Sequence, residues 1–184
     1  MTPISERILR ARLFAREGHD SIGQKRKYSG VPYWTHTEAV AQIVSEYGGT
    51  EDMIIAALNH DLAEDVFPVN PKYSLDLIRA EFGNAVADMV FDLTNQYTKE
   101  NYPLWNRAVR HKKEMERLGL IPEATATIKL SDIFHNTSSI VAECPKFAKT
   151  YLREKESEIN YLCRGDAALW IATKEQIQEG LRSL

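Results

Sequence analysis

The pattern of apolar and polar residues along the chain has the period of α-helices nearly throughout. Apolar positions recur every three or four residues, and no stretch alternates with a period of two in β-branched residues. Helices are expected at residues 5–17, 35–47, 50–64, 75–82, 85–93, 95–122 and 123–144, and once or twice between 150 and 184. The sequence therefore predicts an all-α fold, a helical bundle of a single domain.

The start of the second expected helix carries a capping signal. Thr35 and Glu38 stand three residues apart before an apolar run, the arrangement of a capping box. This predicts that Thr35 caps the helix and that His36 lies in its first turn. Gly48 and Gly49 are expected to end it.

The central stretch combines a buried helix with clustered charges. Residues 53–58 are apolar nearly all round, which indicates an interior helix, and they lead directly into His60, Asp61, Glu64 and Asp65. Residues four apart share a helix face, so His60 is expected to stack with Glu64 and Asp61 with Asp65. Three carboxylates beside an apolar helix repel one another and lose hydration, and a bound cation would compensate for both effects. The alternative is that the end of the helix turns outward into solvent.

The helix expected at 123–144 is apolar on most sides and carries one polar stripe. Lys129, Asp132, Asn136 and Ser139 fall on a single face. Such a stripe points into a site or at solvent, and the apolar remainder favours the interior.

Composition limits the class of protein. The 184 residues carry a net charge of −3, which argues against nucleic acid as a bulk partner. Cys144 and Cys163 have no metal-site spacing, suit a reducing compartment and are expected to be buried. The N-terminus lacks the apolar core of a signal peptide, and no apolar run approaches membrane-spanning length. We expect a cytoplasmic protein that does not bind a membrane. The sequence is compatible with a homo-oligomer.

The interior polar residues suggest a metal site. His36, His60, Asp61 and Asp132 offer two imidazoles and two carboxylates without a thiolate, a set that suits Mn, Fe or Zn. Such an ion activates water and polarises a phosphoryl oxygen.

Further residues would complete a phosphate-processing site. Glu64 and Asp65 would orient or deprotonate the water. Lys129 and the basic loop at residues 25–27 would neutralise phosphate charge, although so short a basic run is more often an ordinary solvated loop.

The motifs now identify a resemblance. His36, the pair His60-Asp61 and Asp132 resemble the H…HD…D pattern of HD metal-dependent phosphohydrolases. The stretches at 23–36, 56–65, 81–87 and 128–137 resemble, more narrowly, the hydrolase domain of RelA/SpoT alarmone enzymes and small stand-alone relatives such as the metazoan SpoT homologue. The resemblance spans about residues 11–140, within a domain of 1–184 whose C-terminal helices occupy about 146–184.

This resemblance implies Mn(II)-dependent hydrolysis of the 3′-pyrophosphate of guanosine tetra- or pentaphosphate, a nucleotide alarmone of the stringent response. It implies His36, His60, Asp61 and Asp132 as metal ligands and Glu64 with Asp65 as the residues that activate water. The implied substrate-binding residues are Arg26, Lys27, Lys129, Asn136 and Ser139.

Two alternatives stay open at this stage. The enzyme could act on another nucleotide, such as an adenosine alarmone, a deoxynucleoside triphosphate or NADPH. The chain could also be a non-catalytic module that binds a nucleotide. Departures from the family pattern, including the inserted Tyr28 and Asn95 in place of a lysine, touch substrate recognition rather than the metal ligands.

Overall fold

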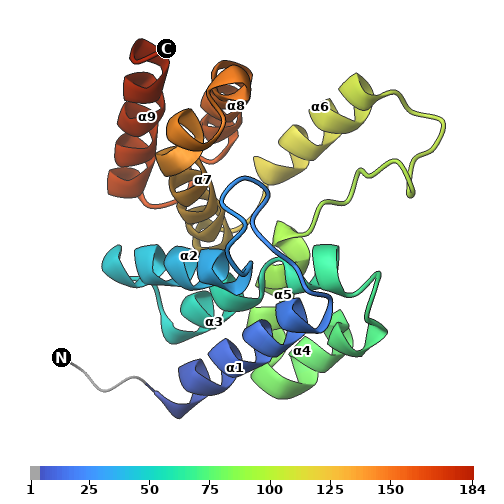
Figure 1. Cartoon of the computed structure of the whole chain (residues 1–184). Coiled ribbons are helices and arrows are strands. Elements are labelled where there is room, and N and C mark those ends of the chain that lie inside the picture. Colours follow the sequence, from blue (N-terminus) through green and yellow to red (C-terminus); the bar gives the residue numbers. More distant parts are fainter. Residues whose placement is uncertain (1–4) are drawn as a thin grey trace. The chain divides into compact units, whose positions relative to one another are not determined.

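The structure, a computed structural model, describes residues 5–184, so residues 1–4 of the expected domain 1–184 lie outside the described part. Between residues 5 and 184 the regular structure is helical, without a strand (Figure 1). The prediction of an all-α fold is confirmed. The chain divides into two compact units, one ending at Thr94 and one spanning Asn95–Leu184. The single domain stays a prediction.

Between residues 5 and 94 the first unit contains five α-helices. They are α1 (Glu6–Ser21), α2 (Trp34–Glu46), α3 (Glu51–Asn59), α4 (Leu75–Phe82) and α5 (Asn84–Leu93). Two short turns of other helix types follow α3, a π-helical turn at Leu62–Val66 and a 3₁₀ turn at Pro71–Tyr73.

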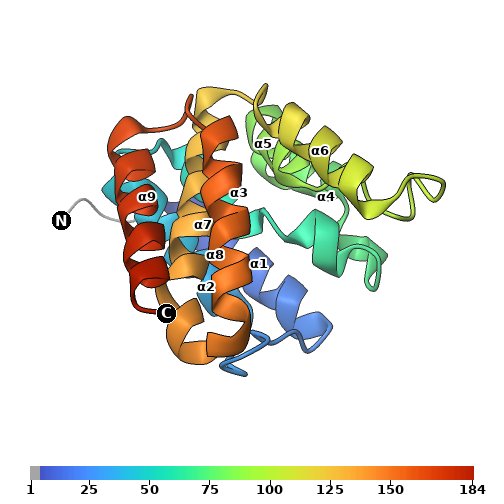
Figure 2. The same ribbon diagram turned by 90° about the horizontal axis from the view of Figure 1, so that it is seen from above.

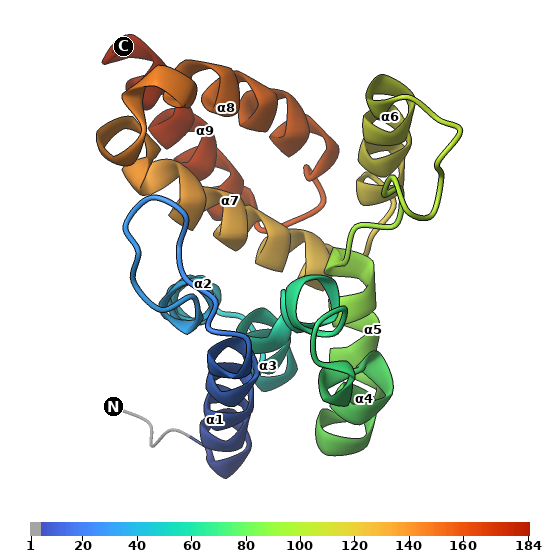
Figure 3. The same ribbon diagram turned by 45° about the vertical axis from the view of Figure 1, so that its right-hand side comes forward.

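Helix α3 is the centre of the first unit. It packs against α1, α2 and α5, as Figure 3 shows. Ile55, Ala56, Ala57 and Leu58 are each fully buried, so this helix is apolar on every side. A helix of this kind is stable only when neighbours cover it all round, and its position explains why the residues that follow it begin in the interior.

The boundaries of α2 and α3 differ from the prediction. The N-cap of α2 is Tyr33, and the Thr35 hydroxyl donates to the carbonyl of Pro32 instead of capping the helix. The prediction of a capping box at Thr35 was wrong because the turn at Pro32 and Tyr33 starts the helix earlier. Helix α3 ends at Asn59 rather than at Glu64.

The second unit contains four α-helices. They are α6 (Arg107–Leu118), α7 (Glu123–Glu143), α8 (Pro145–Glu158) and α9 (Ala167–Arg182). Helices α8 and α9 pack against each other and against α7, and Figure 2 shows the three together. Ile128, Leu130 and Ile133 of α7 are fully buried, which confirms that this helix is interior on most sides.

Residues 95–106, before α6, are irregular, whereas the sequence predicted a helix over the whole of 95–122. The buried carboxylate of Glu114 on α6 accepts backbone hydrogen bonds from Gln96 and Tyr97, at 3.1 and 3.2 Å. These two bonds hold the backbone at the start of the segment, where the amides of Gln96 and Tyr97 do not take part in a helix. The cysteines were also predicted wrongly, because Cys144 is half-buried and Cys163 exposed. No helix within residues 5–184 is long and apolar enough to cross a membrane.

Candidate active site

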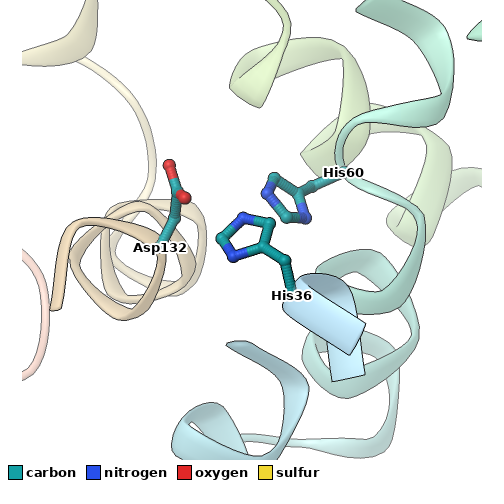
Figure 4. Close-up of side chains that lie close together, drawn as sticks. All are labelled: His36, His60 and Asp132. Atoms are coloured by element: carbon teal, nitrogen blue, oxygen red, sulfur yellow. The ribbon is translucent and has the colours of Figure 1, made fainter. Parts of the chain in front are cut away.

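His36 and His60 bring two imidazoles together inside the first unit. His36 lies in the first turn of α2, as predicted, and His60 directly follows the last residue of α3. Their exposed fractions are 1% and 3%. The ring centroids are 5.4 Å apart, and Figure 4 shows the rings turned toward each other.

Asp61 joins this pair through one carboxylate oxygen. Its Oδ2 lies 3.1 Å from Nε2 of His60 and 3.8 Å from Nε2 of His36. The same oxygen accepts a hydrogen bond from the Tyr33 hydroxyl at 2.7 Å. Three of the four predicted ligands therefore converge within the first unit.

The hydrogen bonding of His60 fits a metal ligand. Its Nδ1 lies 2.8 Å from the carbonyl oxygen of Ala57, and because this oxygen can only accept a hydrogen bond, Nδ1 carries the N–H that donates to it. In the neutral ring the lone pair of Nε2 then faces Oδ2 of Asp61. Two acceptors so close repel each other unless a proton or a cation neutralises them. Metal-ligating histidines commonly donate their other nitrogen to a backbone carbonyl in this way, so the donor set fits a divalent cation.

Glu64 and Asp65 lie on the π-helical turn rather than on a continued α-helix. The amide of Asp65 still donates to the carbonyl of Asp61, at 2.8 Å, whereas the amide of Phe67 reaches back five residues to Leu62, at 2.9 Å. Glu64 is exposed and Asp65 half-buried. Turns of this type occur frequently at functional sites.

The carboxyl of Asp65 is a weaker acid than usual. Burial, followed by the negative charge of Asp61, raises the pKa of Asp65 from 3.8 to about 6. A hydrogen bond from Nε2 of Gln24, at 2.8 Å to Oδ2, acts in the opposite direction. Asp65 is thus ionised at neutral pH with a pKa close to neutrality, the property of a general base.

The basic loop between α1 and α2 carries Arg26 and Lys27. The Arg26 guanidinium lies over the ring of Tyr33, 5.7 Å from its centroid, and the Lys27 ammonium lies 5.3 Å from that of Tyr28. The loop closes through an isolated antiparallel bridge between Lys25 and Pro32. Tyr28, inserted relative to the family pattern, is 38% exposed.

In the second unit, Asp132 is buried on α7, from which Figure 4 shows its side chain projecting. Lys129 contributes an ammonium 2.9 Å from Oδ2, and the Asn136 amide donates to Oδ1 at 2.6 Å. The predicted polar stripe of α7 is therefore a bonded set around Asp132. Ser139 lies half-buried further along the helix.

Two residues that hold the site were not predicted to do so. Tyr33 bonds Asp61, and Gln24 bonds Asp65, across 28 and 41 residues of sequence. Gln24 directly precedes the basic residues 25–27, and Tyr33 follows them in the same connection between α1 and α2. Separations of this size leave no local spacing that could have indicated either bond.

The sequence of this chain is similar to part of the sequences of several known proteins. A probable guanosine-3′,5′-bis(diphosphate) 3′-pyrophosphohydrolase of Synechocystis sp. is 32% identical over 151 residues, which cover 80% of this chain and 18% of that protein. A GTP pyrophosphokinase of Streptomyces antibioticus is 33% identical over 135 residues, 73% of this chain and 14% of that protein. The chain thus spans less than a fifth of the length of these relatives.

A solved structure shows the same fold. It is described as a metazoan orthologue of SpoT that hydrolyses ppGpp and plays a role in starvation responses, and it matches with a TM-score of 0.80. The match covers 98% of this chain and 99% of that one, at 22% sequence identity. A family model for the HD domain matches residues 11–146, and the chain therefore belongs to the HD domain family.

Proposed function

We propose that this chain is a metal-dependent hydrolase that removes the 3′-pyrophosphate of guanosine tetra- or pentaphosphate, releasing GDP or GTP and pyrophosphate. The observation that carries the proposal is the placement of Asp61 Oδ2 within 3.8 Å of Nε2 of both buried histidines, on the HD motif. The descriptions of the Synechocystis relative and of the metazoan orthologue support the choice of substrate.

The proposed metal ligands are His36, His60, Asp61 and Asp132. Asp132 joins the set because it is a buried carboxylate and holds the last position of the H…HD…D pattern that the sequence resembles. Nitrogen and carboxylate oxygen donors without a thiolate suit Mn(II), the ion we propose. When bound, such an ion would lower the pKa of a water molecule that it binds and would polarise a phosphoryl oxygen.

The products define the bonds that change. Releasing intact pyrophosphate requires that water bonds to the phosphorus attached to the ribose 3′ oxygen, and that the bond between this oxygen and phosphorus breaks. The water loses a proton and the 3′ oxygen gains one. Glu64 and Asp65 are proposed to orient the water and accept its proton. Of the two, Asp65 has a pKa raised to about 6, which suits a carboxylate that accepts a proton near neutral pH.

Cationic and amide groups would hold the nucleotide. Arg26 and Lys27 lie on the basic loop, and the Arg26 guanidinium, which lies over the ring of Tyr33, would stack on a base. Lys129 would neutralise phosphate charge, and Asn136 with Ser139 would bind ribose or phosphate.

The first test is incubation with guanosine tetraphosphate and Mn(II), with a chelator control, followed by anion-exchange analysis of the products. GDP and pyrophosphate that form only with metal are expected. If the chain cleaves an adenine nucleotide or NADPH instead, the guanine assignment is wrong while the hydrolase assignment holds. If it cleaves no nucleotide but binds one, it is a binding module.

Two variants separate metal binding from water activation. Asp61→Ala is expected to abolish Mn(II) binding and turnover together, because it removes a ligand. Glu64→Ala should retain Mn(II) binding, measured by titration calorimetry, and lose turnover by about 100-fold or more. Full activity of Glu64→Ala would exclude its role on water. The cytoplasmic location and a homo-oligomer stay predictions from the sequence.

A further inference from the structure

A chain of two side-chain hydrogen bonds leads from the interior of the first unit to Asp65. Nδ1 of His19 lies 2.6 Å from Oε1 of Gln24, and Nε2 of Gln24 donates to Oδ2 of Asp65 at 2.8 Å. His19, on the last turn of α1, is fully buried. Neither His19 nor Gln24 belongs to the ligands, bases or phosphate-binding residues proposed above.

The backbone of Gln24 is held on both sides. Its amide donates to the carbonyl of His19 at 3.0 Å, and its carbonyl accepts from the amide of Tyr33 at 3.1 Å. The residue is therefore tied to the end of α1 and to the start of α2. This leaves the side-chain torsions as the principal freedom of Gln24.

The orientation of the Gln24 amide follows from its two partners. A carboxylate at Asp65 accepts only, so the NH₂ group of Gln24 must face it and the carbonyl oxygen must face His19. His19 then carries its proton on Nδ1. The opposite tautomer would set two acceptors 2.6 Å apart and would bury an N–H at Nε2, which has no hydrogen-bond partner among residues 5–184.

The ring of His19 is fixed and neutral. It packs on Tyr33 with ring centroids 4.9 Å apart. Burial lowers the pKa of His19, against the effect of its bond to Gln24, so the ring keeps a single proton near neutral pH. Near neutral pH, Nδ1 of His19 therefore always presents an N–H to the side-chain oxygen of Gln24.

We propose that His19 and Gln24 are positioning residues, which fix the rotamer of the Asp65 carboxylate, with His19 acting through Gln24. The bond from Gln24 engages Oδ2, and no described residue donates to Oδ1. Oδ1 is thereby aimed as the oxygen that receives the proton of water. Because Asp65 acts on water only if the proposed function holds, the effect on hydrolysis rests on that function, whereas the orientation of the carboxylate does not.

The test compares two variants of His19 in the full chain. His19→Asn keeps an N–H donor close to the place of Nδ1, whereas His19→Leu removes it. We expect His19→Leu to lower kcat about 10-fold or more, with KM and Mn(II) affinity unchanged, because a slightly misplaced base slows the reaction without weakening binding. His19→Asn should restore kcat to within about 3-fold of the wild type.

A second readout does not use activity. In metal-free protein labelled with ¹⁵N, the side-chain amide protons of Gln24 should exchange slowly and resonate apart from those of exposed glutamines. His19→Leu should remove both properties and His19→Asn should keep them. Where His19→Leu fails to fold, Gln24→Met serves for the kcat measurement, with Gln42→Met, on an exposed glutamine that bonds Glu46, as the matched control.

The outcomes are distinct. Equal loss of kcat in His19→Asn and His19→Leu would overturn the proposal, and so would full kcat in His19→Leu or in Gln24→Met. If the wild type hydrolyses no nucleotide while the Gln24 signals still differ between the two His19 variants, the proposed function fails and the positioning of Asp65 stands.

Discussion

Replacing Asp65 by asparagine should stabilise the metal-free protein at neutral pH. Asp65→Asn keeps the shape of the side chain and an oxygen that can accept from Gln24, but it removes a half-buried negative charge close to Asp61. The pKa of Asp65 is raised to about 6, from 3.8, by burial and by Asp61. The folded state therefore binds a proton at pH values at which the unfolded state has lost it.

The sign and size of the effect follow from this difference. Between pH 3.8 and about 6 unfolding releases a proton, so the free energy of unfolding falls as pH rises, and the full penalty is present above about pH 6. One pKa unit corresponds to about 1.4 kcal/mol, so the shift corresponds to about 3 kcal/mol. Solvent screening at this half-buried site reduces the expected gain for Asp65→Asn to about 1–2 kcal/mol.

The assay is urea unfolding followed by circular dichroism, with chelator present, at pH 7.5 and at pH 4. The gain should be largest at pH 7.5 and shrink toward pH 4, with unchanged dependence on urea concentration. Asp76→Asn makes the same chemical change at an exposed site in the first turn of α4, and should instead lower stability by about 0.3–1 kcal/mol. An Asp65→Asn variant less stable than the wild type at pH 7.5, or a gain independent of pH, would refute the reasoning.

Three further variants test individual contacts. Tyr33→Phe removes the hydroxyl that bonds Asp61, and should weaken Mn(II) binding about 10-fold in calorimetry; unchanged affinity would contradict a role in orienting the ligand. Gly165→Ala places a Cβ 3.0 Å from the backbone nitrogen of Thr127, and should lower the free energy of unfolding by about 1–3 kcal/mol, whereas a neutral effect would show that the turn can move. Glu114→Gln sets an amide NH₂ against donors and should cost about 1–3 kcal/mol in urea unfolding, and no cost would mean that water satisfies those donors.

The helices of the first unit, and the position of His60 and Asp61 directly after a buried helix, could be predicted because their signals are local. The apolar run ending at Leu58 predicts a buried helix, and the helix delivers His60 and Asp61 into the interior. The start of α2 could not be predicted from Thr35 and Glu38, because the carbonyl of Pro32 competes for the Thr35 hydroxyl. Such competition depends on the conformation of the preceding loop, which a spacing pattern does not contain.

The unpredicted part of the site depends on long-range bonds. The Tyr33 hydroxyl and the Gln24 amide meet their carboxylates only after α1, α2 and α3 have packed together. The carboxylates could be predicted from the sequence, whereas the groups that bond to them could not. The ligand role of Asp132 stays a prediction, although its bonds to Lys129 and Asn136 explain the polar stripe of α7.

The π-helical turn at Leu62–Val66 should be more sensitive to a change in its length than to the substitution of a side chain. The hydrogen bond from the amide of Phe67 to the carbonyl of Leu62 spans five residues, one more than the bond of an α-helical turn. Deleting a single residue there would let an ordinary helix continue, and would rotate everything beyond it by about 100° relative to α3. Insertions and deletions in this segment would therefore displace the residues of the site, whereas exchange of the Ala63 side chain leaves the path of the backbone unchanged, and natural variants of the segment should keep its length more strictly than the identity of Ala63.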